Sequence, residues 1–170
     1  KWVLEGLFGP AYKVTKTDDL MQKGHLAKLD ITCIVLKHPP KKFEVFEDEV
    51  QYIIGHDQRN NFIKNLVVDL KGNTLVLFQR VESHGLPLYE LINDNTIPGR
   101  KVFFVHGGVG TVERETVREI VERESNAIIV ASYGVFSTGI NIRNLHNVVF
   151  ASPSKSRIRN LQSIGRVLRR

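Results

Sequence analysis

Short apolar segments at residues 74–78, 101–105, 127–131 and 147–151 alternate with segments whose apolar residues recur at helical spacing. Each apolar run is short and continuous, which is typical of a strand that is buried on both faces. Helices are expected at 60–70, 83–93, with Ser83 as N-cap, and 112–124, and a last helix is expected to begin near 154–156. This order predicts an α/β fold with a parallel sheet sandwiched by helices, whose ligands lie in the loops after the strands. Those loops are 79–83, 106–110, 132–141 and 152–156.

The first 55 residues are less regular. Residues 13–28 predict a polar connector, whereas 29–36 alternate partly and predict a strand that would place Cys33 in the core. The chain starts with Lys1 and lacks the pattern of a secretory signal, so we interpret it as a segment of a longer protein. Its apolar runs are too short to span a bilayer, and a single cysteine fits a reducing, intracellular setting.

The net charge of +6 is concentrated at the C-terminus. Residues 151–170 contain six basic residues and no acidic one, so the rest of the chain carries equal numbers of both. Clustered arginines favour either a solvated face or a phosphate-bearing partner. Charge alone does not choose between a nucleic acid and a nucleotide.

The last expected helix carries the most specific pattern. Gln162, Arg166 and Arg169 are spaced i, i+4, i+7 and fall on one stripe, opposite a set of apolar residues. Gly165 lies near this stripe at a cost of about 1 kcal/mol in helix propensity, which indicates that something large approaches the backbone. Two arginines and an amide on a rigid helix suit a polyanion such as a triphosphate. The alternative is the solvated basic face of an ordinary amphipathic helix.

The pattern Q-x-x-G-R-x-x-R at 162–169 resembles motif VI of superfamily 2 helicases. Residues 75–79 resemble motif IV, residues 105–107 with Arg114 resemble the segment called IVa, and residues 128–141 resemble motif V. Together they resemble the C-terminal RecA-like lobe of such a helicase, and parts of the wording resemble a phage recombination and repair helicase. The resemblance implies a connector at 1–28 from an N-terminal motor lobe and a RecA-like domain at 29–170, whose sheet can lack the last strand because the sequence stops at Arg170.

The resemblance also implies roles for individual residues. Arg166 and Arg169 would reach the phosphates of ATP across an interlobe cleft, one of them as an arginine finger, a role that contributes about 10³–10⁵ in rate in other NTPases. The nucleotide-binding set would also include Gln162, Gly139 and Asn141. Many relatives have an acidic residue where Asn141 stands, so this position departs from the family pattern. The nucleic-acid-binding set, which would contact backbone phosphates, comprises Arg80, His106, Ser132 and Thr138.

The partners implied are ATP with Mg²⁺, held mainly by the N-terminal RecA-like lobe of the same protein, and DNA that is single-stranded or branched. RNA remains an alternative, and no membrane partner is expected. If the protein is encoded by a phage, its location would be the cytoplasm of the bacterial host.

Several motifs are missing from the sequence. It contains neither a P-loop nor a metal-binding acidic pair after a buried strand, so the chain alone is not expected to hydrolyse ATP. A dinucleotide loop is excluded because Glu113 stands where its third glycine would be. The six histidines lack ligand spacing, so no metal site is predicted and most of them are expected at the surface. The alternative function is a non-catalytic nucleic-acid-binding domain with a helicase-like fold, which leaves the motif VI spacing unexplained.

Overall fold

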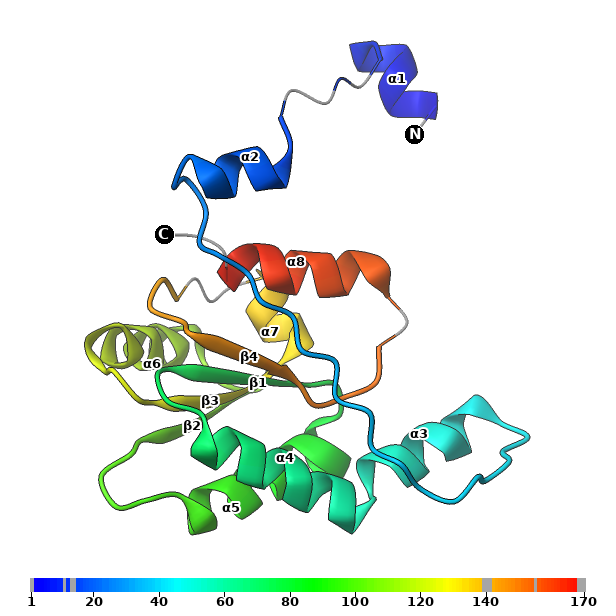
Figure 1. Ribbon diagram of the computed structural model, residues 1–170, viewed down its shortest axis with the longest axis vertical. Coiled ribbons are helices and arrows are strands. Elements are labelled where there is room, and N and C mark those ends of the chain that lie inside the picture. Colours follow the sequence, from blue (N-terminus) through cyan, green and yellow to red (C-terminus); the bar gives the residue numbers. More distant parts are fainter. Residues whose placement is uncertain (1, 11, 13–14, 139–141, 155, 168–170) are drawn as a thin grey trace. The chain divides into compact units, whose positions relative to one another are not determined.

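The computed structural model describes residues 2–10, 12, 15–138, 142–154 and 156–167 (Figure 1). The chain divides into two units, one comprising the residues up to Ile31 and the other Thr32–Val167. The first unit contains two short helices, α1 (Trp2–Phe8) and α2 (Thr17–Gln22), neither of which buries a residue. The second unit contains the sheet and the helices that cover it.

The sheet is parallel, as predicted. Its strands are β1 (Thr74–Phe78), β2 (Val102–Val105), β3 (Ile128–Ser132) and β4 (Asn147–Phe150), in the order β2-β3-β1-β4. Every residue of the two central strands is buried, which explains their continuous apolar sequence. In the register, Phe78 lies beside Ser132 and Val105 lies beside Ala131. The carboxyl ends of β1, β2 and β3 therefore meet at one edge of the sheet.

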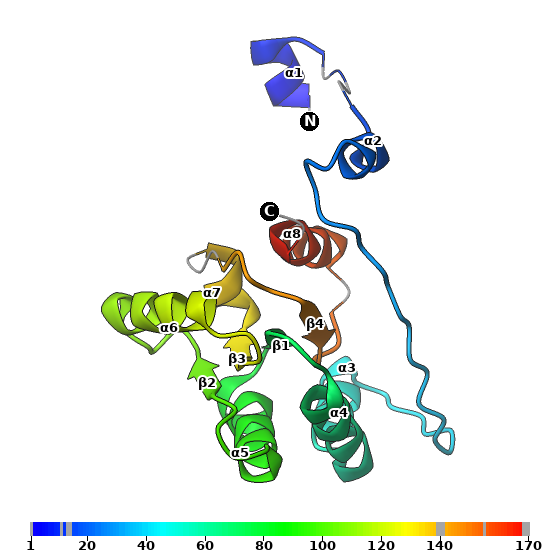
Figure 2. The same ribbon diagram turned by 60° about the vertical axis from the view of Figure 1, so that its left-hand side comes forward.

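Helices cover both faces of the sheet (Figures 1 and 2). Helices α4 (Asp57–Asp69) and α5 (Leu86–Asn95) pack on one face, whereas α6 (Thr111–Arg123) and α7 (Tyr133–Thr138) pack on the other. Helix α8 (Arg157–Val167) lies beside α7. Alternate residues of a strand enter opposite cores: in β1, Leu75 and Leu77 pack towards α6 and α7, and Val76 and Phe78 pack towards α4 and α5.

The amino edge of the sheet is held by Asn73, which is fully buried. The two hydrogens of its side-chain amide are shared among the carbonyl oxygens of Val121 (3.0 Å), Glu124 (2.8 Å) and Asn144 (2.8 Å), and its Oδ1 accepts the N–H of Ala127 (2.8 Å). One side chain thus joins the end of α6, the start of β3 and the segment before β4. These contacts meet the hydrogen-bonding needs of backbone groups that leave regular structure inside the protein.

Arg100 fastens a second point of the same edge. Its guanidinium donates to the carbonyl oxygens of Val68 (2.7 Å) and Leu70 (2.8 Å) at the end of α4, and to that of Asn126 (2.9 Å) before β3. The planar fork of an arginine suits several acceptors at once, and it satisfies carbonyl groups that the end of a helix leaves open. Burial lowers the pKa of this guanidinium.

Two expectations from the sequence are wrong. Residues 29–36 form no strand, and Cys33 is exposed, because nothing pairs with this segment in the part of the chain that the structure describes. Ser83 does not cap a helix: it lies inside a π-helix, η1 (Val81–Gly85), and α5 begins only at Leu86. Pro87 favours this start, since proline fits the first turn of a helix, where its missing N–H costs nothing.

Helix α3 (Phe46–Ile54) was not expected from the sequence. It precedes α4 and buries Val50 and Ile54, which are one helical turn apart. Through α3, residues from the irregular N-terminal third of the chain come next to the sheet.

Candidate functional site

Three of the predicted nucleic-acid-binding residues lie along the carboxyl edge of the sheet. Ser132 is the last residue of β3, His106 follows β2 directly, and Arg80 comes two residues after the end of β1. Because β2, β3 and β1 are neighbours, the structure brings the three residues to the same edge. Ser132 is buried, with 8% of its surface exposed, so it is less accessible than Arg80 and His106.

His106 is held in one orientation by the turn that follows β2. The N–H of Gly108 donates to Nδ1 of His106 at 3.1 Å, and the imidazole packs against the ring of Phe104 with the ring centroids 5.2 Å apart. Since Nδ1 accepts this bond, Nε2 carries the proton of the neutral ring and is a donor. A Cβ at Gly108 would lie 2.9 Å from the His106 ring, so a side chain at this position would push the ring out of its orientation.

Arg80 is paired with an acidic residue of α3. Its Nη2 lies 2.5 Å from Oε2 of Glu47, whose Oε1 also accepts from Nε2 of Gln51 at 3.1 Å. The hydrogen bond from Arg80, together with the one from Gln51, lowers the pKa of Glu47. The Arg80 side chain remains 35% exposed, so its guanidinium is accessible while it is paired.

Buried polar side chains fix the loop after β4 against the end of β1. Oγ of Ser152 accepts the N–H of Gln79 at 3.0 Å and is 2.8 Å from Nδ1 of His84, while the Tyr133 hydroxyl donates to the Ser152 carbonyl oxygen at 3.3 Å. Burial, with the nearby charge of Arg59, lowers the pKa of His84 to about 4. His84 is therefore neutral at physiological pH, and the loop that leads to α8 has a defined starting point.

Helix α8 presents its predicted ligand face only in part. Gln162 and Gly165 are exposed, whereas Ser163 is buried and Ile164 is half-buried. Arg166 belongs to the same helix, one turn beyond Gln162. The side chains of Arg166 and Thr138 lie outside the described residues, and so do Gly139, Asn141 and Arg169 entirely. The predicted roles of these five residues stay predictions.

Residues 58–170 match the model of the helicase conserved C-terminal domain. The chain belongs to this family. Its fold is the RecA-like lobe found at the C-terminal side of helicase motors, in agreement with the four-stranded parallel sheet.

Known proteins resemble this helicase C-terminal domain along most of its length. It is 40% identical over 173 residues to the ATP-dependent DNA helicase uvsW of Enterobacteria phage T4, an alignment that covers 97% of this chain and 34% of that protein. It is 33% identical over 117 residues to a protein of Acanthamoeba polyphaga mimivirus named as a "putative ATP-dependent RNA helicase", covering 66% of this chain and 20% of that protein. The domain thus spans about a third of the uvsW protein and a fifth of the mimivirus one.

The crystal structure of T4 UvsW agrees with the helicase C-terminal domain in three dimensions. The TM-score is 0.65 at 41% sequence identity, and the match covers 74% of this chain and 25% of that one. The two chains are therefore similar in sequence as well as in fold.

Sequence reasoning missed several polar residues of the helicase domain's carboxyl edge. Glu47 pairs with Arg80, Arg59 donates through Nη2 to the carbonyl oxygen of Ala151, and His84 is buried although most histidines were expected at the surface. Each of these contacts joins positions at least 33 residues apart. The available signal was indirect: His84 and Ser152 belong to or adjoin two of the loops predicted to follow strands.

Within the described ranges, none of the domain's helices combines the length and the apolar character that crossing a membrane requires. The same residues contain no group of three histidine, cysteine or acidic side chains placed to hold a metal ion.

Proposed function

We propose that this chain is the C-terminal motor lobe of an ATP-dependent DNA helicase or translocase that acts in recombination or repair. The observation that carries the proposal is the placement of Arg80, His106 and Ser132 on one edge of a helicase-family sheet. The name of the uvsW relative, an ATP-dependent DNA helicase, supports DNA as the substrate and ATP as the fuel. The mimivirus relative, named for RNA, is the reason to test both nucleic acids.

The nucleic-acid half of the proposal concerns the sheet edge. Arg80 supplies a positive charge and His106 supplies the Nε2 donor, both suited to the oxygens of a phosphate. Thr138 would add a hydroxyl. Ser132 is largely covered, so it would bind through its backbone groups or after a local movement of the chain. Such contacts grip a strand without reading its sequence, as a motor that moves along DNA requires.

The nucleotide half of the proposal concerns α8 and the segment after α7. Gln162 is exposed on α8, and Arg166 and Arg169 follow at one-turn spacing. We infer that these arginines face a triphosphate held by an N-terminal RecA-like lobe and stabilise the charge that develops in phosphoryl transfer. Gly139 and Asn141 would line the same cleft. In this arrangement Mg²⁺ would be held mainly by the N-terminal lobe and would neutralise phosphate charge.

Closure and opening of the two lobes would convert this chemistry into movement. Binding of ATP brings the α8 arginines to the nucleotide, and hydrolysis releases them, so the cleft opens. If the sheet edges of the two lobes hold the strand alternately, each cycle moves the protein along it. This chain would supply one of the two surfaces that hold the strand, and its sequence contains no phosphate-binding loop.

The deciding experiment measures DNA-stimulated phosphate release from ATP by the full-length protein that contains this chain, with the 170-residue chain run alongside. We expect turnover only in the full-length protein. Arg166→Ala and Arg169→Ala should each abolish turnover and leave DNA binding largely intact. Arg118→Ala is the matched control, because Arg118 is paired with Glu115 and Glu122 on α6, and its turnover should equal that of the wild type.

Persistent turnover in both α8 variants would refute the arginine-finger assignment. DNA binding without any ATP turnover in the full-length protein would instead support the non-catalytic binding domain. Repeating the stimulation with RNA of the same sequence determines which nucleic acid activates the motor.

A further inference from the structure

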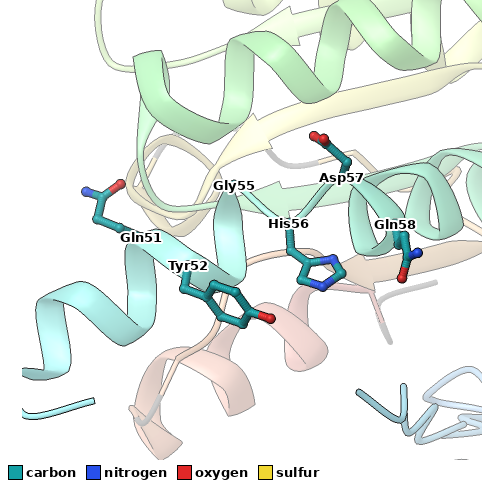
Figure 3. A pocket seen from close by; sticks show the side chains of 6 residues that line it. All are labelled: Gln51, Tyr52, Gly55, His56, Asp57 and Gln58. Carbon is teal, nitrogen blue, oxygen red and sulfur yellow. The ribbon is translucent and has the colours of Figure 1, made fainter. Parts of the chain in front are cut away.

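A hollow of about 390 Å³ lies where α3 passes into α4. It is lined by Gln51, Tyr52, Gly55, His56, Asp57 and Gln58 (Figure 3). Figure 3 shows the rings of Tyr52 and His56 next to each other on one side of the backbone, and the carboxylate of Asp57 pointing away from them. The lining therefore combines two flat rings with the amides of two glutamines, one at each end.

The rings belong to a larger aromatic group. The Tyr52 ring centroid is 5.4 Å from that of His56, at an interplanar angle of 88°, and 5.2 Å from that of Phe43. The ring of His38 is 6.1 Å from that of Tyr52. Because the planes of Tyr52 and His56 are nearly perpendicular, the two rings already make the edge-to-face contact that aromatic side chains favour, and a flat molecule would stack on a ring face that this contact leaves open.

Positive charge lies beside these rings. The ammonium group of Lys41 is 4.3 Å from the centroid of the Tyr52 ring and 5.3 Å from that of Phe43. Lys37 and Lys42 flank it in sequence, whereas acidic side chains begin at Glu44, continue through the first turn of α3 and include Asp57 of the lining, whose carboxylate points away from the rings (Figure 3). An aromatic hollow with cations on one side is the combination that stacks a nucleobase and attracts the adjoining phosphates.

The hollow adjoins the carboxyl edge of the sheet. Gln51, which lines it, hydrogen-bonds to Glu47, and Glu47 is paired with Arg80 at the end of β1. His56 is the N-cap of α4, accepting the N–H of Arg59 at 3.3 Å, and the Arg59 side chain reaches the carbonyl oxygen of Ala151 after β4. The aromatic hollow and the proposed phosphate contacts are therefore linked by direct side-chain bonds.

We propose that the Tyr52–His56 hollow is a base-binding site, which takes one base of the strand whose phosphates pass Arg80. The inference rests on the proposed function for the strand and adds a site that none of the helicase motifs contains. The base would stack against the rings, Gln58 would reach its polar edge, and Lys41 would face a neighbouring phosphate. Because every base has a flat face, the site would hold any base with little sequence preference.

The test compares two probes on the full-length protein: a short oligothymidylate and an abasic oligonucleotide of the same length. Tyr52→Ala should weaken binding of the oligothymidylate by about five- to tenfold, the lower range for one stacked base, and leave the affinity for the abasic strand unchanged. Tyr52→Phe keeps the ring and should bind both probes within about twofold of the wild type. Tyr12→Ala is the matched control, since Tyr12 is an exposed tyrosine of the other unit.

Equal loss on both probes would mean that Tyr52→Ala disturbs the fold of the edge, and it would overturn the proposal. So would unchanged binding of the oligothymidylate by this variant. Failure of the proposed function would give a different result. In that case the wild-type protein itself would fail to bind either probe, or it would fail to hydrolyse ATP. Lys41→Ala should weaken both probes alike and reduce the salt dependence of binding, since it removes a charge and not a ring.

Discussion

Replacing Asn73 by alanine should destabilise the domain more than any other single truncation of a polar side chain at the amino edge. The Asn73 side chain makes four hydrogen bonds to backbone groups and is fully buried. Two of its acceptors keep a second donor: Val121 O still accepts the N–H of Glu124, and Glu124 O still accepts Nδ2 of Asn144. The carbonyl oxygen of Asn144 and the N–H of Ala127 lose the partner that the structure gives them.

The expected magnitude follows from these two groups. A buried polar group without a partner costs about 1–3 kcal/mol, so two of them give a loss of about 4 kcal/mol. A domain of this size has about 5–15 kcal/mol of stability in total, and the loss would therefore be severe. Asn73→Asp keeps the acceptor for Ala127 but points a carboxylate oxygen at carbonyl groups, so at neutral pH it should be at least as destabilising.

The assay is urea unfolding followed by far-ultraviolet circular dichroism, with the free energy taken from the midpoint at an unchanged slope. Asn95→Ala is the control, because the Asn95 side chain makes one exposed hydrogen bond to the carbonyl oxygen of Leu91, and its loss should stay within about 0.5 kcal/mol. If Asn73→Ala were as stable as the control, the view that one amide organises the amino edge would be wrong.

Three further predictions concern stability. The pKa of His84 in the folded chain, about 4, lies below the ~6.5 of an unfolded histidine, so the unfolded state binds an extra proton between these values. Stability should therefore fall by up to about 3 kcal/mol as the pH drops from about 6.5 to 4, and urea titrations of His84→Asn should show a smaller fall. Arg100→Lys should cost about 2–3 kcal/mol in the same titrations at neutral pH, because an ammonium cannot reach the three carbonyl oxygens at once. A Cβ at Gly85 would lie 2.6 Å from two ring atoms of Phe78, so Gly85→Ala should lower the melting temperature, whereas Gly134→Ala in α7, which meets nothing within 4 Å, should leave it equal or higher.

The sheet could be predicted from the sequence because its strands carry a local signal. Residues 74–78 and 128–132 are buried on both faces, so continuous apolar runs mark them without knowledge of their partners. The partial alternation at 29–36 is also a local strand signal. A strand forms only when another strand pairs with it, however, and the sequence of the segment does not determine whether a partner is available. Helix α3 was missed although its signal is present in the sequence, since Phe46, Val50, Ile53 and Ile54 recur at helical spacing after an acidic first turn.

The sequence predicted which residues lie at the carboxyl ends of the strands, and that part of the candidate site could be predicted. Arg80, His106 and Ser132 lie together because each follows or ends a neighbouring strand. The partners of these residues were not predictable, because the Arg80–Glu47 and His84–Ser152 contacts depend on how distant segments pack. The assignments of Arg166, Arg169, Gly139, Asn141 and Thr138 rest on motif resemblance and remain predictions for the ATP-turnover and DNA-binding experiments.

The two edges of the sheet differ in how completely their hydrogen-bonding capacity is used. At the amino edge, the planar groups of Asn73 and Arg100 bond to seven backbone groups between them. Among the described residues, buried side-chain atoms without a partner concentrate at the opposite edge, in or near the first turn of a helix, and they include Nη1 of Arg59, Nε2 of His84 and Nε of Arg114. These atoms are covered by protein, so side chains at this edge would have to move before any of them could bond to a partner from outside.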